Sequence, residues 1–241
     1  MPAEPRTKEP SSNPGQPLCV DWLGSVPYRD GLELQEAAMA DVRVGGADRL
    51  LLLEHPPVIT LGRSTDRAHL LEDEVALAAR GGAVEEVRRG GDVTYHGPGQ
   101  LVGYLILNLR LRGAVDVHRF VRDLETALIT ATAALGVKTT TVPGRTGVFV
   151  APEIGRPTQK IASIGVGVRH WITYHGFALN VDVDLSGFDA IVPCGLADVT
   201  MTSLAEQGAG GPLAFRAREA VVSAFGRTFL NADPAVIAPG A

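Results

Sequence analysis

The sequence predicts an α/β (α+β) fold in which helices flank a mixed β-sheet. Short apolar runs of strand length alternate with longer stretches whose apolar residues recur every three or four positions. Strand-like segments also occur in pairs, separate from the helices, which is typical of a mixed sheet with helices packed against it. This pattern does not give the order of the strands.

The first elements alternate between strand and helix. Leu18–Leu23 and Arg49–Leu53 are predicted strands, and the amphipathic segment Tyr28–Val44 between them is a predicted helix. Pro56–Pro57 interrupts the chain before another apolar run at Val58–Leu61, because proline has no backbone N–H to donate.

The clearest helix is predicted within Val115–Leu135. Its apolar side chains recur at spacings of three and four, which places them on one helical face, and Gly136 follows as a natural stop. These apolar residues are Val117, Phe120, Val121, Leu124, Leu128, Ala131 and Leu135.

The second half of the chain is richer in strands. Apolar residues alternate imperfectly through Gly147–Val150, Lys160–Arg169 and Trp171–Val183, and these three segments are predicted strands. Pro212–Leu230 is predicted to form the closing helix.

One compact domain is expected over residues 18–232, because no internal repeat or low-complexity linker divides the chain. Residues 1–17 are rich in Pro, Ser, Glu and Lys and are expected to be a disordered tail, and residues 233–241 a loose one. No signal-peptide pattern is visible and no apolar run approaches the roughly 18 residues that cross a bilayer. A cytoplasmic protein without a membrane partner is therefore expected.

Composition excludes several classes of protein. The chain has 241 residues, of which 45% are hydrophobic, so it is able to bury a sizeable core. Its formal net charge of −5 argues against a nucleic-acid-binding surface, which would require a basic excess. The two cysteines, Cys19 and Cys194, do not resemble the dense disulfide framework of a small secreted domain.

A glycine-rich segment is the first candidate for chemistry. Between Arg88 and Gln100 the chain has four glycines, a proline, two arginines and a histidine. Glycines allow backbone to approach a ligand closely, although a turn between strands has the same composition. The spacing matches neither a phosphate-binding loop nor a dinucleotide-binding fingerprint.

Lys160 and Cys194 form the second candidate. Lys160 heads an apolar strand, where it either marks a solvated strand end or points a compact positive charge into a cleft. Cys194 lies between Pro193 and Gly195, in a predicted turn that is able to present a thiol, whereas an isolated cysteine is often an inert packing residue. A nearby ammonium would favour the thiolate and activate Cys194 as a nucleophile.

The remaining histidines and Cys19 are assigned no chemistry. His175 lies in a β-rich stretch and is interpreted as a structural residue, and Cys19 as a packing residue in the first strand. His55, His69, His118 and His170 form no ligand pattern, so no metal site is expected.

In their order along the chain, these segments resemble the lipoyl(octanoyl) transferase family, the octanoyl-acyl-carrier-protein:protein N-octanoyltransferases. The matching segments are RGGDVTYHGPGQLVGY (Arg89–Tyr104), KIASIGVGVRHWITYHGFALNV (Lys160–Val181) and IVPCG (Ile191–Gly195), with Thr202–Leu204 after the cysteine. The resemblance extends over about residues 18–230. One departure is Leu105, where the family commonly has proline, and we expect it to change local rigidity only.

The resemblance implies a fold similar to the catalytic domain of biotin and lipoate protein ligases. It also implies that Cys194 forms an acyl-thioester intermediate and that Lys160 lowers the pKa of its thiol. The substrate-binding residues that it implies are Arg89, Gly90, Gly91, Asp92, Val93, Thr94, Tyr95, His96, Ser163, Ile164, Gly165, Gly176, Phe177 and Ala178.

By this resemblance, the chain is expected to transfer an octanoyl or lipoyl group from acyl carrier protein to a lysine of apo lipoyl domains, in protein lipoylation. The acceptors would be E2 subunits of 2-oxoacid dehydrogenases and the glycine cleavage H protein. No cofactor is expected, since thioester exchange is near balance and amide formation runs downhill. The resemblance implies a monomer, and Arg88 and Arg89 are candidates for a basic rim that meets acidic partners.

Three alternative functions differ from this one in what they require of Cys194 and the rest of the chain. An ATP-dependent lipoate or biotin protein ligase has a similar fold but would not need Cys194. A papain-type cysteine protease has its cysteine before its histidine, whereas every histidine here precedes Cys194. A binding module that only holds an acyl chain leaves Lys160 and Cys194 without a role.

Overall fold

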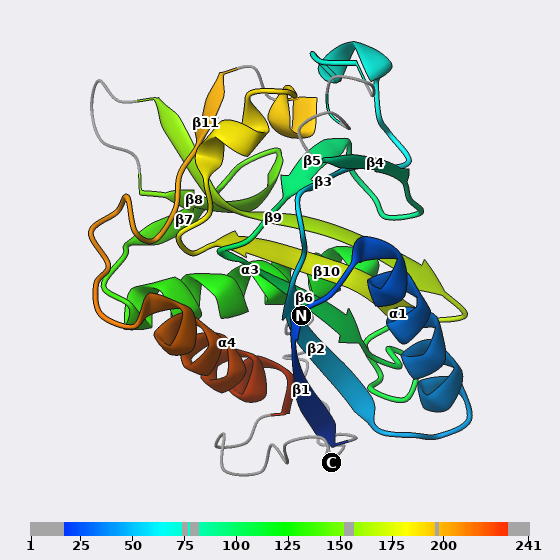
Figure 1. Cartoon of the computed structure of the whole chain (residues 1–241). Coiled ribbons are helices and arrows are strands. Elements are labelled where there is room, and N and C mark those ends of the chain that lie inside the picture. Colours follow the sequence, from blue (N-terminus) through cyan, green and yellow to red (C-terminus); the bar gives the residue numbers. More distant parts are fainter. Residues whose placement is uncertain (1–16, 74–76, 78–81, 152–156, 196–197, 231–241) are drawn as a thin grey trace, which may run out of the picture.

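The computed structural model describes residues 17–73, 77, 82–151, 157–195 and 198–230, and Cys194 by its backbone only. The two predicted tails therefore lie outside the described residues, except for Pro17. Within the described part the fold is α/β with a mixed sheet, as predicted (Figure 1).

The main sheet has eight strands and combines parallel with antiparallel pairs. β1 runs parallel to β2 and β11 parallel to β9, whereas the other neighbours are antiparallel. The order is β1 (Leu18–Ser25), β2 (Asp48–Glu54), β6 (Gln100–Ile106), β10 (Ile172–Asn180), β9 (Thr158–Arg169), β8 (Arg145–Val150) and β7 (Thr139–Val142), with β11 (Val199–Met201) beside β9.

A second, three-stranded sheet lies beside the first. Its order is β4 (Ala83–Glu86), β3 (Val58–Leu61) and β5 (Val93–His96). Only β3 corresponds to a predicted apolar run; β5 lies inside the glycine-rich segment, where turn-type residues conceal a four-residue strand. The small sheet thus places this segment beside β9 of the main sheet, where the Gly90 N–H donates to the Val166 carbonyl (Figure 1).

All three predicted helices are present. They are α1 (Tyr28–Arg43), α3 (Val117–Ala134) and α4 (Leu213–Leu230). The Asp116 side chain accepts a hydrogen bond from the Arg119 N–H and caps α3, as an N-cap residue does. α1 packs on one face of the main sheet, while α3 and α4 pack against each other on the opposite face (Figure 1).

The four leucines of β2 show why both faces need helices. Leu50 and Leu52 join the core under α3 and α4, whereas Leu51 and Leu53 join the core under α1. All four side chains are at most 5% exposed. A continuous apolar run is typical of a strand that is covered on both faces, since successive side chains point to opposite sides.

β9 and β10 form a hairpin that extends across the sheet. Their connection, His170 and Trp171, has φ of +54° and +65° at the two residues, as in a type I′ turn. Gly165 and Gly176 lie opposite each other in the register of this pair. The hairpin therefore holds the predicted segments 163–165 and 176–178 side by side.

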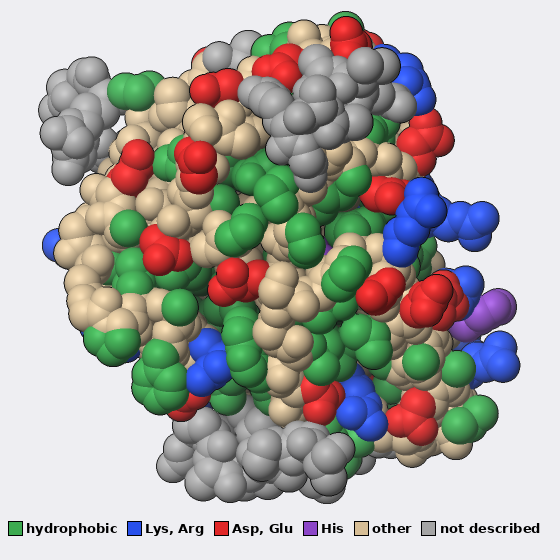
Figure 2. Space-filling model, in the orientation of Figure 1, with side chains coloured by type: hydrophobic (Ala, Val, Ile, Leu, Met, Phe, Trp, Pro, Cys, Tyr) green, Lys and Arg blue, Asp and Glu red, His purple; other side chains and the backbone are tan. Residues whose placement is uncertain are grey.

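Short 3-10 helices connect the remaining segments: η1 (Arg67–His69), η2 (Leu185–Phe188) and η3 (Pro193–Gly195). The face in Figure 2 shows hydrophobic side chains gathered around a hollow in its middle. Within the described ranges, none of the helices has the length and apolar character needed to span a bilayer.

Leu52 provides a test of this core. Replacing Leu52 with alanine should lower the free energy of unfolding by about 2–5 kcal/mol, because the side chain is fully buried in the core beneath α3 and α4. Urea unfolding measures this loss. Leu34→Ala, on the exposed side of α1, is the matched control and should change stability far less; equal losses would contradict the packing described.

Candidate active site

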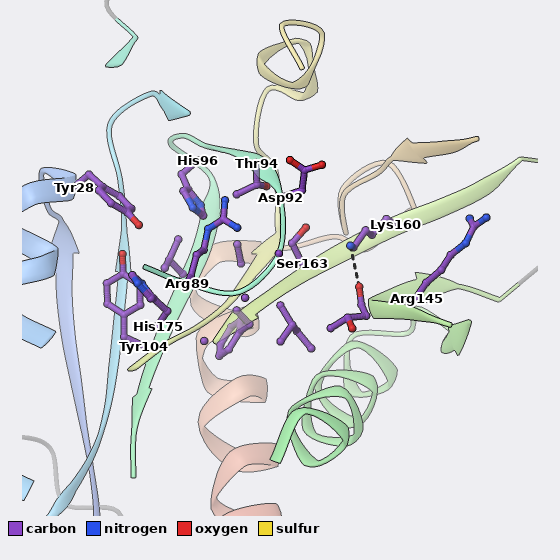
Figure 3. A pocket seen from close by; sticks show the side chains of 18 of the residues that line it. Tyr28, Arg89, Asp92, Thr94, His96, Tyr104, Arg145, Lys160, Ser163 and His175 are labelled. Carbon is purple, nitrogen blue, oxygen red and sulfur yellow. Dashed lines mark hydrogen bonds between the residues drawn. The ribbon is translucent and has the colours of Figure 1, made fainter. Parts of the chain in front are cut away.

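A cavity of about 220 Å³ lies where the glycine-rich segment meets the β9–β10 hairpin (Figure 3). Twelve of the predicted substrate-binding and catalytic residues line it: Arg89, Gly91, Asp92, Thr94, His96, Lys160, Ser163, Ile164, Gly165, Gly176, Phe177 and Ala178. Residues without a predicted role also line it: Tyr28, Val102, Tyr104, Gly144, Arg145, Thr146 and His175. Two of the three motifs, Arg89–Tyr104 and Lys160–Val181, are thus brought together around one cavity.

Three predicted residues of the glycine-rich segment lie outside the cavity lining. Val93 is fully buried beneath the small sheet, and the Tyr95 ring lies 5.3 Å from the Phe188 ring, centroid to centroid. Because side chains alternate along β5, Thr94 and His96 face the cavity and their neighbours face away. Gly90 pairs by its backbone instead, donating its N–H to the Val166 carbonyl at 2.8 Å.

Lys160 points inward at one end of the cavity. Its side chain is 2% exposed, and Nζ donates to the Thr146 carbonyl at 3.0 Å (Figure 3). Nζ also lies 5.5 Å from the centroid of the Phe149 ring, within range of a cation–π interaction. The alternative of a solvated strand end is therefore wrong.

A glycine in β8 makes room for this lysine. Gly147 has φ of +125°, and a Cβ there would lie 2.6 Å from Lys160 Cε, so only glycine fits. The Gly147 N–H donates to Oε1 of the buried Glu125 in α3 at 3.1 Å. Helix α3 thus fixes the strand that cradles Lys160.

The backbone directly after Cys194 lies against a residue of the cavity lining. Cys194 is the middle residue of η3, and Gly195 after it has φ of +67°. A Cβ on Gly195 would lie 2.7 Å from Asp92 Oδ2, and Asp92 lines the cavity with Lys160. Beyond the turn, β11 pairs with β9 so that Met201 is opposite Lys160.

The opposite end of the cavity is polar. The His55 Nδ1–H donates to the Val26 carbonyl at 2.6 Å, so His55 Nε2 accepts from the Tyr104 hydroxyl at 2.6 Å. His175 has φ of +56° within β10, and its N–H donates to Gln35 Oε1 of α1 at 2.7 Å. An αL histidine in a strand is strained backbone, and it turns this side chain into the cavity (Figure 3).

Burial keeps these groups uncharged. Desolvation, aided by the charges of His55 and Arg89, lowers the pKa of His96 to about 3. Desolvation and the Arg89 charge lower the pKa of His175 to about 3 as well. Desolvation raises the pKa of Tyr28 to about 12. This end of the cavity therefore presents neutral polar groups.

Arg89 corrects one expectation. It is only 7% exposed, and its guanidinium donates to the Thr60 carbonyl at 2.7 Å and the Thr60 hydroxyl at 2.8 Å. The expectation that Arg89 forms part of a basic rim is wrong, whereas its neighbour Arg88 is exposed.

The apolar wall of the cavity is continuous with the core. Phe177 lines the cavity, and its ring centroid lies 5.0 Å from that of Phe225 in α4. Gly103 of β6 lies against this ring, since a Cβ there would come within 2.2 Å of Phe177 Cε1. Val102, Ile164 and Ala178 add further apolar surface. A slender apolar chain would suit this wall.

The sequence alone does not indicate the polar end, because these residues come from three separate segments. Tyr28 begins α1, Tyr104 lies in β6, and His175 in β10 was interpreted as structural. The positive φ of His175 has no signature in the sequence. Tyr104 closes the first motif of the resemblance and was the one available signal. Among the described residues, no group of three or more His, Cys, Asp or Glu side chains is arranged to hold a metal ion.

Comparisons with known proteins show the family of this chain. A family model described as the lipoyl protein ligase A/B catalytic domain matches residues 27–226. A protein of Acidobacterium capsulatum named octanoyltransferase is 52% identical over 190 residues, covering 76% of this chain and 77% of its own length. One of Syntrophotalea carbinolica with the same name is 50% identical over 192 residues, covering 79% and 84%.

A solved structure of lipoate-protein ligase A bound with ATP is similar in fold. It has a TM-score of 0.69 at 16% identity, covering 93% of this chain and 88% of that one. The predicted resemblance, the mixed-sheet fold and the acyltransferase class of enzyme are confirmed by these comparisons.

The buried histidines predict how stability depends on pH. An unfolded chain protonates these imidazoles near pH 6.5, whereas the folded chain does so only near pH 3. The contribution of these histidines to stability is therefore fully present above about pH 6.5. The free energy of unfolding falls as the pH decreases, by about 2 kcal/mol per histidine at pH 5. Urea unfolding at about pH 7 and pH 5 measures this loss.

His175→Asn should remove about one histidine's share of the acid-induced loss, since asparagine tolerates the αL backbone. The matched control is His118→Gln, which replaces an exposed histidine of α3 and should leave the wild-type pH dependence unchanged. An unchanged pH dependence in His175→Asn would contradict the assignment.

Proposed function

Because the chain belongs to the lipoyl protein ligase A/B catalytic domain family, we propose that it transfers an octanoyl group to a lysine of apo lipoyl domains through a thioester on Cys194. One observation carries this proposal: the buried Lys160 lines a cavity with an apolar wall, and the backbone beside Cys194 lies against Asp92 of the same lining. The names of the relatives support the octanoyl group.

In the first half-reaction, the Cys194 thiolate attacks the thioester carbonyl of octanoyl-acyl carrier protein. The new C–S bond forms on Cys194 and the carrier thiol leaves. The Lys160 ammonium favours the thiolate, since an opposite charge in contact lowers the pKa of an acid. The acyl chain lies along Ile164, Phe177 and Ala178.

The Ser163 hydroxyl supports binding of the acyl group. It is buried at the cavity wall and has no hydrogen-bond partner among the described residues. Since an unsatisfied buried hydroxyl is unfavourable, an acyl oxygen would supply the missing partner. Of the residues implied by the resemblance, those lining the cavity bind substrate directly, and Gly90, Val93 and Tyr95 shape the segment.

In the second half-reaction, the ε-amine of the acceptor lysine attacks the Cys194 thioester and forms an amide. The acceptors we propose are the lipoyl domains of 2-oxoacid dehydrogenase E2 subunits and of the glycine cleavage H protein, in the cytoplasm. Arg88 is exposed at a second pocket, which shares His175 with the cavity, and is the remaining candidate to meet an acidic partner. This is covalent catalysis of ping-pong form.

Intact mass spectrometry tests the intermediate. After incubation with octanoyl-acyl carrier protein, the wild type should gain one octanoyl group, and Cys194→Ala should gain none. Cys19→Ala is the matched control, because Cys19 is a free, partly buried thiol in β1, and it should be acylated like the wild type. An adduct that persists in Cys194→Ala would remove the mechanism. A strict ATP requirement with Cys194 dispensable would select the ligase alternative.

Lys160→Ala should slow acylation at neutral pH by about tenfold or more, because loss of an adjacent cation reduces the thiolate fraction. The rate should recover partly as the pH rises and the thiol ionises without assistance. Lys138→Ala, which removes an exposed lysine, is the matched control and should keep the wild-type rate. Carrier binding with no turnover in the wild type would instead support a non-enzymatic binding module.

A further inference from the structure

His69 and Asp92 form a pair to which the proposed mechanism gives no part in proton transfer. His69 is the last residue of η1, and Asp92 lies in the glycine-rich segment. His69 Nδ1 lies 2.5 Å from Asp92 Oδ2, and the two side chains are 30% and 11% exposed. The two residues are 23 positions apart in the sequence, so the sequence alone did not indicate a role for His69.

This pair lies against the turn that carries Cys194. A Cβ on Gly195 would come within 2.7 Å of Asp92 Oδ2 and 2.9 Å of His69 Cε1, so the ring edge faces the residue directly after the cysteine. The backbone is tied there as well, since the Val192 N–H donates to the His69 carbonyl at 2.8 Å. An antiparallel bridge between Leu70 and Ile191 continues this contact.

Asp92 fixes the tautomer of His69. Its Oδ1 accepts from the Val93 N–H at 2.7 Å, which orients the carboxylate, and its Oδ2 accepts from His69 Nδ1–H. His69 Nε2 then carries the lone pair of the neutral imidazole. Within the described residues Nε2 has no hydrogen-bond partner, and the ring is accessible to solvent. A carboxylate–imidazole pair beside a nucleophile is a common arrangement for a base.

The geometry points to His69 as the base that deprotonates the acceptor lysine in the second half-reaction, with Asp92 as its positioning residue. This inference rests on the proposed function. An exposed lysine has a pKa of about 10.4 and arrives as an ammonium, which cannot attack a thioester until it loses a proton. The base must therefore lie beside Cys194 on the side open to the acceptor protein.

The incoming lysine loses two protons in this step. His69 Nε2 takes one proton from the ammonium, and the freed amine attacks the thioester carbonyl. The C–N bond forms, the nitrogen loses a second proton to water, and the C–S bond breaks as the electron pair returns to sulfur. Lys160 stays an ammonium opposite the recovered thiolate, and His69 releases its proton to solvent.

Lys160 is poorly placed to deprotonate the acceptor lysine. It is 2% exposed, and its Nζ donates to the Thr146 carbonyl at the inner end of the cavity. An acceptor lysine that enters from solvent meets the 30%-exposed His69 at the outer side of the turn. Lys160 and His69 thus divide the work between the two half-reactions.

Single-turnover discharge of the acyl-enzyme tests the inference. Octanoylated wild type and His69→Gln are mixed with apo lipoyl domain or with hydroxylamine, and loss of the adduct is followed by intact mass. With the lysine acceptor, His69→Gln should be slower by about a hundredfold, as is usual for loss of a general base. With hydroxylamine, which is uncharged near neutral pH and needs no prior deprotonation, it should change little.

Two further variants and the outcomes below decide whether His69 is the base. Asp92→Asn should slow lysine discharge in the same direction, and the exposed-site control His118→Gln should match the wild type with both nucleophiles. If His69→Gln discharges to the lysine acceptor at the wild-type rate, or slows equally with both nucleophiles, the inference is overturned and the pair only ties η1 to the glycine-rich segment. Absence of any acyl adduct in the wild type would instead overturn the proposed function.

Discussion

Burial of the Lys160 ammonium is the constraint on which the rest of the site depends. Removing a cation from water is unfavourable unless its environment supplies compensating contacts. Here the Thr146 carbonyl and the Phe149 ring supply these contacts, and both residues belong to β8. β8 reaches this position only because Gly147 leaves space for the lysine stem. The register of β8 against β9 therefore determines where the charge lies.

The same register connects the lysine to the segment after the cysteine. Met201 lies opposite Lys160, and the Thr202 N–H donates to the Lys160 carbonyl at 3.0 Å. The segment after Cys194 is thus attached to the strand that carries Lys160, and the His69 carbonyl accepts from the Val192 N–H on the other side of the turn. Adjacent strands and backbone hydrogen bonds, which are rigid, set the geometry of the site.

Sequence patterns predicted the parts of the fold that repeat locally. The three- and four-residue spacing within Val115–Leu135 fixed α3 to within two residues at its start, and the alternation in 160–183 identified β9 and β10. β4 and β5 were not predicted because each has only four residues, too few to show a period, and neither is a continuous apolar run as β3 is. Their strand character comes from pairing with β3, a contact between segments distant in sequence.

The candidate site likewise has parts that the sequence indicates and parts that only the structure reveals. Lys160 and the two glycine-containing motifs were visible because each is continuous in sequence. Arg88 and Arg89 look alike in the sequence, yet one is exposed and the other is bonded to Thr60, a difference that only tertiary packing creates. The αL backbone of His175 and the contact of His69 with Asp92 likewise depend on how the hairpin and η1 pack.

The continuity between the cavity wall and the core links selectivity to stability. Phe177 lines the cavity on one side and contacts Phe225 of the last helix on the other, with Gly103 leaving room for its ring. A change in the depth of the cavity at this wall must therefore also repack the interior beneath it. Evolution of ligand preference at this wall is bound to a trade-off with stability, because its residues Val102, Ile164, Phe177 and Ala178 all pack into the core as well.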